Sequence, residues 1–150
     1  MAVTGRLVLD EGLRFRAESN SGQSLVLDTL AGEHGGGGGP TPKELLPIAL
    51  GGCTGMDVIS ILRKMQQEVT AFEVIVEGET APEHPRRYLS WKVVFHLEGT
   101  GLEPAKISRA IALSRDRYCS VSTSLDPASP RAYYYTINGS DPEEVTEAAD

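Results

Sequence analysis

Two cysteines are the residues of this chain whose chemistry stands out. Cys53 lies in an apolar run that begins after Thr41, and Cys119 lies far along the chain in the segment Tyr118-Cys-Ser-Val-Ser. A thiol in apolar surroundings, matched to one distant second thiol, suggests redox chemistry on sulfur. The residues alone leave an alternative open, two inert structural cysteines, because free cysteine is among the most buried residue types.

The composition excludes several classes of function. The 150 residues fit one domain, or two small lobes that share a core. The acidic residues 139–150 contribute much of the net charge of -7. There is no basic stripe, so we expect no nucleic-acid partner. There is no apolar run of about 18 residues and no leader-like N-terminus, so we expect no membrane span and a cytoplasmic location. In the cytoplasm a transient catalytic or sensing disulfide is more plausible than a stable structural one.

The spacing of potential ligands predicts no metal site and no bound cofactor. His34, His84 and His96 are scattered, and together with the cysteines they form neither a C-x-x-C nor an H-x-x-x-H pattern. The glycine-rich loop 31–40 precedes a helix, as a phosphate-binding loop does, but the Gly-Lys-Ser/Thr of such a loop does not follow it. We therefore interpret the loop as a mobile connector.

The elements that must position the cysteines follow the order β-β-β-α-β-β-α-β. Hydrophobic periodicity predicts a single domain over 1–150 with an α+β fold and antiparallel sheet. The acidic tail is expected to form a short frayed helix or to stay disordered. The predicted ranges are N-terminal strands in 1–30, the loop 31–40, the Cys53 helix 41–67, strands in 71–98, a second helix 102–116, a last strand 132–138 and the tail 139–150.

The helix that carries Cys53 is the clearest of these elements. Thr41 and Glu44 have the spacing of a capping box. From Leu45 to Leu62 the helix is apolar on nearly every side, which predicts that it runs through the middle of the molecule and that a second subunit covers part of it. Glycines inside the helix predict the close approach of another backbone or a ligand beside Cys53: Gly51, Gly52 and Gly55.

Three motifs together resemble the OsmC/Ohr superfamily. They are Thr41-Pro-x-Glu-Leu-Leu with Ala-Leu-Gly-Gly-Cys53-Thr, then Val74-x-Val-x-Gly-Glu, and then Tyr118-Cys119-Ser-Val-Ser. The resemblance runs from about residue 13 to residue 138. It implies an α+β fold in which antiparallel β-sheets wrap around two central helices and two chains intertwine as a homodimer.

The resemblance also implies thiol-dependent reduction of organic hydroperoxides in oxidative-stress defence. Cys53 would be the peroxidatic cysteine that becomes a sulfenic acid, and Cys119 would condense with it to a disulfide. An external dithiol, of the lipoyl type in some members, would restore the thiols without a bound cofactor. The alternative is a noncatalytic protein of the same fold that binds a small hydrophobic ligand or senses redox state.

A peroxidatic thiol needs a cation beside it. Burial raises a thiol's pKa, and the helix dipole falls off before it reaches Cys53. In relatives an arginine held by a glutamate plays that part, and the glutamate commonly follows the helix proline. Here Lys43 stands at that position and Glu44 comes one residue later. The candidate cations are Arg14, Arg16 and Lys43 itself.

Overall fold

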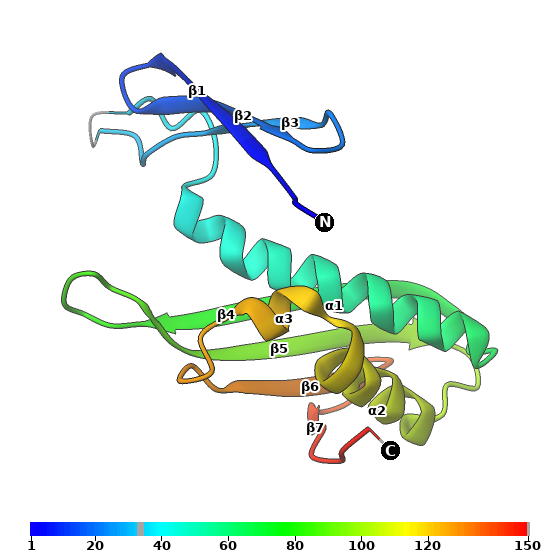
Figure 1. The fold of residues 1–150 in the computed structure, drawn as a ribbon. Helices are drawn as coiled ribbons and strands as arrows, with labels where there is room; N and C mark the ends of the chain where they lie inside the picture. The colour runs from blue at the N-terminus through cyan, green and yellow to red at the C-terminus, as the bar shows by residue number, and fades with distance from the viewer. Residues whose placement is uncertain (33–34, 150) are drawn as a thin grey trace. The chain divides into compact units, whose positions relative to one another are not determined.

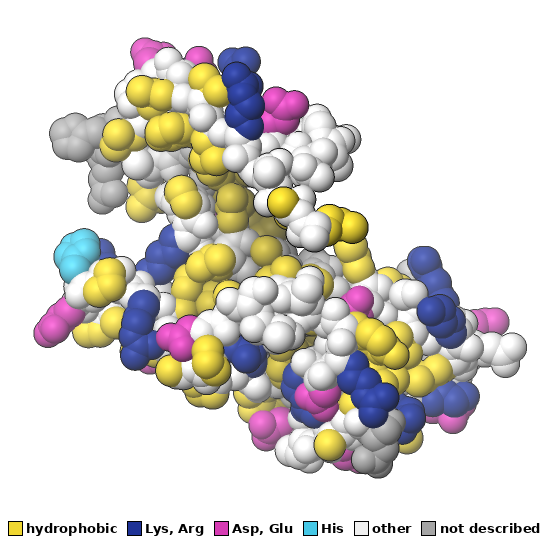
Figure 2. Space-filling view, in the orientation of Figure 1, with side chains coloured by type: hydrophobic (Ala, Val, Ile, Leu, Met, Phe, Trp, Pro, Cys, Tyr) yellow, Lys and Arg dark blue, Asp and Glu magenta, His cyan; other side chains and the backbone are white. Residues whose placement is uncertain are grey.

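The computed structural model describes residues 1–32 and 35–149 and divides into two compact units, Met1–Leu46 and Pro47–Asp150 (Figure 1). The N-terminal unit is an antiparallel sheet of β1 (Gly5–Glu11), β2 (Arg14–Ser19) and β3 (Ser24–Leu27), which confirms the strands predicted in 1–30. Exposed apolar side chains lie on both faces of the sheet, because successive residues of a strand point to opposite faces: Leu7, Val8, Leu9, Leu25 and Val26. Figure 2 shows hydrophobic side chains on one side of this unit.

The glycine-rich loop is tied to β3 by one carboxylate. Asp28 accepts backbone hydrogen bonds from Gly36 at 3.3 Å, Gly38 at 3.0 Å and Thr29 at 2.8 Å. The Gly38 bond is the largest of the influences that lower the pKa of Asp28. These loop amides therefore bind an anion of the chain itself. Residues 33–34, including His34, lie outside the described residues.

The C-terminal unit is a four-stranded sheet with helices packed on one face (Figure 1). Its core joins side chains of the helices to those of the two central strands. The strands are β4 (Val69–Thr80), β5 (Tyr88–Gly99), β6 (Arg131–Ile137) and β7 (Glu143–Glu144). The helices are α1 (Leu45–Lys64), α2 (Pro104–Leu113) and α3 (Ser120–Ser124), with a π-helical turn, η2 (Ser114–Tyr118), between the last two.

The predicted α+β class is correct, but a purely antiparallel sheet is wrong for one pair of strands. β4 and β5 are antiparallel, whereas β5 and β6 run parallel. Between β5 and β6 the chain passes through α2, η2 and α3, and such a helical crossover returns the next strand in the same direction. Alternating strand patterns do not encode this choice.

The helix boundaries differ from the prediction at both ends of each helix. The capping box is confirmed: Thr41 N–H donates to Glu44 Oε2 at 2.7 Å, and Glu44 N–H donates to Thr41 Oγ1 at 3.4 Å. It caps a 3₁₀ turn, η1 (Pro42–Glu44), after which α1 runs only to Lys64. The second predicted helix, 102–116, is shorter as α2, and α3 was not predicted.

One face of α1, and not its whole circumference, is buried. Leu50, Val58 and Leu62 are fully buried in the core, whereas Ile48 is 62% and Met56 74% exposed in the single chain. The stretch Pro42–Lys64 is long enough and, with a mean hydropathy of 1.7, apolar enough to span a membrane. The sequence analysis had expected no such stretch. Its packing against the sheet identifies α1 as a core helix.

Two of the three α1 glycines allow the helix to approach β4. A Cβ at Gly51 would lie 3.0 Å from Val76 Cγ2, and one at Gly55 would lie 3.2 Å from Val74 Cγ2. A close approach is therefore present at these two positions, but the neighbours are side chains of β4 and not the backbone or ligand that was predicted. At Gly52 the predicted close approach is wrong, because a Cβ there would meet no described atom within 4 Å.

Alanine substitutions at neighbouring glycines should affect stability differently. We expect Gly52→Ala to stabilise the protein by about 1 kcal/mol, because it restores helix propensity in open space. Gly51→Ala should be at least ~1 kcal/mol less stable than Gly52→Ala, because its methyl group presses on Val76. Urea unfolding of both variants measures the difference, and equal free energies would contradict the tight α1–β4 contact.

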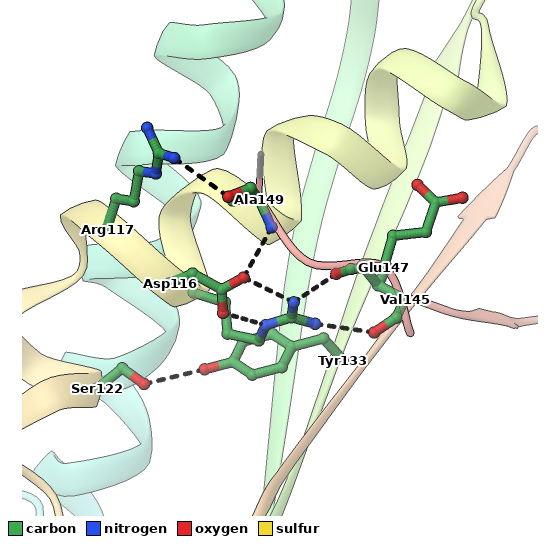
Figure 3. A network of polar contacts seen from close by, with 8 residues as sticks. Asp116, Arg117, Ser122, Tyr133, Val145, Glu147 and Ala149 are labelled. Atoms are coloured by element: carbon green, nitrogen blue, oxygen red, sulfur yellow. Dashed lines mark hydrogen bonds and ion pairs between the residues drawn. The ribbon is translucent and has the colours of Figure 1, made fainter.

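The acidic tail is ordered over residues 139–149, in contrast to the prediction of a frayed helix or disorder. β7 pairs with β6, and Val145 is buried with its N–H donating to Tyr133 O at 2.8 Å. Arg115 donates to the carbonyls of Val145, at 2.9 Å, and Glu147, while its salt-bridge partner Asp116 accepts from Ala149 N–H at 3.0 Å (Figure 3). The prediction rested on the acidic composition of the tail. It missed these contacts because they use backbone groups of the tail, and their partners lie far away in the sequence.

Removing the Arg115 guanidinium should release this tail. We expect Arg115→Ala to abolish the hydrogen-exchange protection of the amides of Val145 and Ala149, measured on C-terminal peptides by mass spectrometry. Arg117→Ala, which removes one bond to Ala149 O at 3.2 Å, is the matched control with a smaller effect. Unchanged protection in Arg115→Ala would show that β7 pairing alone holds the tail.

The same ion pair gives the tail a dependence on pH. Hydrogen bonding from Arg115 is the main cause that lowers the pKa of Asp116. A carboxyl group with a lowered folded-state pKa stabilises the folded state above its unfolded pKa and loses that contribution as pH falls through the folded value. We therefore expect the tail of the wild type to be released as pH falls through the folded-state pKa of Asp116, which hydrogen exchange of the C-terminal peptides across that range would show.

Candidate functional site

The fold brings the two predicted site residues together. Cys53 is half-buried on α1, and Cys119 is 1% exposed at the residue that precedes α3. Their Sγ atoms lie within 4.8 Å of each other, and both are free thiols. The two cysteines come from distant parts of the chain, and the crossover from β5 to β6 carries Cys119 back to α1.

Local structure fixes the position of Cys119. The π-helical turn η2 ends there, with Cys119 N–H donating to Ser114 O at 2.9 Å. Its Sγ then caps α3 by accepting from Ser122 N–H at 3.3 Å. The hydroxyls of Ser122 and Tyr133 are hydrogen-bonded at 3.1 Å, which joins this cap to β6 (Figure 3). The residues that follow the second predicted helix, 102–116, thus form the end of a π turn and the cap of α3.

The electrostatics of the site keep Cys119 a neutral thiol at neutral pH. Its pKa is raised to about 11, mainly by burial, and the Ser122 N–H bond opposes that shift. The hydrogen bond and charge of Cys53 and the charge of Asp57 contribute to the same rise. Cys119 is therefore a poor first nucleophile, and the more exposed Cys53 is the sulfur that an incoming molecule can reach.

Asp57 is a third member of the site that the sequence analysis missed. It follows Cys53 by one turn on α1, and a carboxylate oxygen lies within 4.8 Å of both sulfurs. Ser114 Oγ donates to Asp57 Oδ2 at 3.0 Å and holds that carboxylate in place. The signal that could have found it is an ionisable residue four positions after Cys53 in an otherwise apolar helix, since residues i and i+4 share a helix face.

The predicted cations belong to the other unit. Arg14 pairs with Asp10 at 3.1 Å, and Arg16 lies 3.9 Å from the same carboxylate. Lys43 also lies in Met1–Leu46, whereas Cys53 lies in Pro47–Asp150. The activation of Cys53 by one of these three cations stays a prediction.

Glu44, the residue next to Lys43, is engaged in capping. It accepts from both Thr41 N–H and Thr41 Oγ1, and the Thr41 N–H bond is the main cause that lowers its pKa.

The comparisons with known proteins agree with this architecture. A family model described as OsmC-like protein matches residues 35–132. Protein YhfA of Escherichia coli strain K12 is 36% identical over 127 residues, which are 85% of this chain and 92% of that protein. A hypothetical protein from Aquifex aeolicus VF5 has a solved structure with 25% identity and a TM-score of 0.80, covering 92% of this chain and 97% of that one.

A more distant solved structure is that of an organic hydroperoxide resistance protein, OsmC, from Legionella pneumophila. It shares the fold at 14% identity with a TM-score of 0.64, over 91% of this chain and 97% of the other. The family match covers most of the chain, and YhfA matches nearly its whole length. On this sequence and structural evidence, the chain belongs to the OsmC-like protein family.

Proposed function

We propose that this protein is a cysteine-based peroxidase that reduces organic hydroperoxides in oxidative-stress defence. The observation that carries the proposal is the pair of free sulfurs, Cys53 and Cys119, within 4.8 Å of each other. Membership of the OsmC-like family supports a redox or peroxide-resistance role, and the Legionella pneumophila relative is named for resistance to organic hydroperoxides.

The proposed reaction begins at Cys53. Its thiolate attacks one peroxide oxygen, the O–O bond breaks, and the departing alkoxide takes a proton to leave as an alcohol. Cys53 is now a sulfenic acid, oxidised by two electrons. The half-buried position of Cys53 admits the peroxide, while the burial of Cys119 keeps the second thiol out of this step.

Cys119 completes the oxidative half of the cycle. Its sulfur attacks the sulfenic sulfur, and the thiol proton leaves with the hydroxyl group as water. A disulfide requires an S–S distance of about 2.05 Å, so the sulfurs must close from a separation of up to 4.8 Å. Rotation of side chains at the start of the short helix α3 is the simplest way to achieve this. An external dithiol of the lipoyl type then reduces the Cys53–Cys119 disulfide by thiol–disulfide exchange and is itself oxidised to a disulfide.

The working protein is proposed to be a homodimer in which sheets wrap around two central helices. Exposed apolar residues on α1 support this, because a soluble single chain rarely leaves such a face uncovered: Leu46, Ile48 and Met56. Similar side chains are exposed on the N-terminal sheet. A reducing compartment, the cytoplasm, would supply the dithiol.

The experiment that tests the function is mass analysis of the reduced protein after one equivalent of cumene hydroperoxide. We expect rapid loss of two hydrogens per chain, and a peptide map that joins Cys53 to Cys119. Thiols that remain unmodified after minutes would overturn the peroxidase proposal. They would favour the second candidate, a noncatalytic ligand-binding or slow redox-sensing protein, which the neutral state of Cys119 beside Asp57 also fits.

A further inference from the structure

We propose that the reduced protein binds one divalent cation of the Zn²⁺ and Cd²⁺ class through Cys53 Sγ, Cys119 Sγ and a carboxylate oxygen of Asp57. All three ligand atoms lie within 4.8 Å of one another. Spacing along the sequence predicted no metal site, because Cys119 lies far along the chain from Cys53 and Asp57. The inference does not depend on peroxidase activity.

The three ligand atoms lie close enough together to share one tetrahedral metal ion. Zinc binds sulfur at about 2.3 Å and carboxylate oxygen at about 2.0–2.2 Å, so its ligands lie about 3.5–3.8 Å apart. Ligand atoms within 4.8 Å therefore need to close by at most about 1.3 Å. Cys53 and Asp57 are one turn apart on a long helix, the spacing that places two ligands of helical zinc sites on one face.

Neighbouring groups already orient two of the ligands. Ser114 Oγ donates to Asp57 Oδ2 at 3.0 Å, which holds the carboxylate and still leaves it lone pairs for a cation. Ser122 N–H donates to Cys119 Sγ at 3.3 Å. Hydrogen bonds of this kind hold the metal-binding side chains in place at metal sites and are costly to remove.

The charge and donor types select the class of ion. Two thiolates and a carboxylate carry three negative charges when deprotonated, and a divalent cation compensates for two of them. Sulfur donors favour zinc and softer ions over Mg²⁺ or Ca²⁺. Three protein ligands leave a fourth position for water or an exogenous thiol.

The test is a titration of the reduced wild-type protein with Cd²⁺ under anaerobic conditions, followed by the thiolate-to-cadmium charge-transfer band. Zn²⁺ affinity is measured by competition with a chromophoric chelator. Binding should saturate at one ion per chain and release about two protons. The variants are Cys53→Ser, Cys119→Ser and Asp57→Asn, with Glu98→Gln, which alters an exposed carboxylate on β5, as the matched control.

We expect Asp57→Asn to weaken Cd²⁺ and Zn²⁺ binding at least about tenfold with the band retained, and each serine variant to weaken it more and to lose part of the band. Glu98→Gln should bind as the wild type does, and circular dichroism should show all variants folded. Wild-type affinity in Cys53→Ser, Cys119→Ser or Asp57→Asn, or saturation at half an ion per chain, would overturn the site. Peroxide-driven disulfide formation is scored separately, so either proposal can fail alone.

Discussion

Replacing Cys53 by serine should remove the reaction with organic hydroperoxide altogether. A serine hydroxyl at this position is not ionised at neutral pH and cannot accept the peroxide oxygen as sulfur does. The remaining thiol, Cys119, is buried and has its pKa raised to about 11, so it offers little thiolate as a substitute. The second-order rate constant for peroxide consumption should therefore fall at least about a thousandfold.

The measurement is stopped-flow consumption of cumene hydroperoxide by the reduced protein. The substitution is nearly isosteric and lies on a half-buried part of α1, so the unfolding midpoint should change little. An unchanged midpoint shows that the variant is folded and that the loss of reaction is a loss of chemistry. Consumption at the wild-type rate by the serine variant would place the reacting group elsewhere in the protein.

Replacing Cys119 by serine should preserve the first reaction and damage the recycling that follows it. Cys53 still meets the peroxide, so one equivalent of alcohol should form at close to the wild-type rate. The sulfenic acid then lacks its partner sulfur and persists, so a second peroxide oxidises it to sulfinic acid, which the dithiol cannot reverse. We expect steady-state turnover to fall at least about tenfold and to decline with each cycle.

Trapping with dimedone and intact-mass analysis distinguish these products. A serine hydroxyl can still accept from Ser122 N–H, so the cap of α3 should survive the change. Sustained turnover in Cys119→Ser without over-oxidation would show that the external thiol reduces Cys53 directly. Cys119 would then have a structural role at the start of α3.

Much of the local structure could be predicted from neighbouring residues alone. The three N-terminal strands, the capping box at Thr41 and the two long strands appear where alternation and capping chemistry place them. The two glycine contacts with β4 follow from the cost of glycine inside a helix, which must be offset by packing. The motifs around Cys53 and Cys119 also indicated the family, which the family match confirms.

The sequence determined which groups the site contains, whereas the tertiary structure decided how they meet. The parallel return of β6, the anchoring of the acidic tail by Arg115 and the place of Asp57 beside both sulfurs were all missed. Each depends on contacts between residues far apart in the chain, and hydrophobic periodicity reports only the local environment of a segment. Cys53 and Asp57 share a helix face by local geometry, but only the crossover that delivers Cys119 makes them one site.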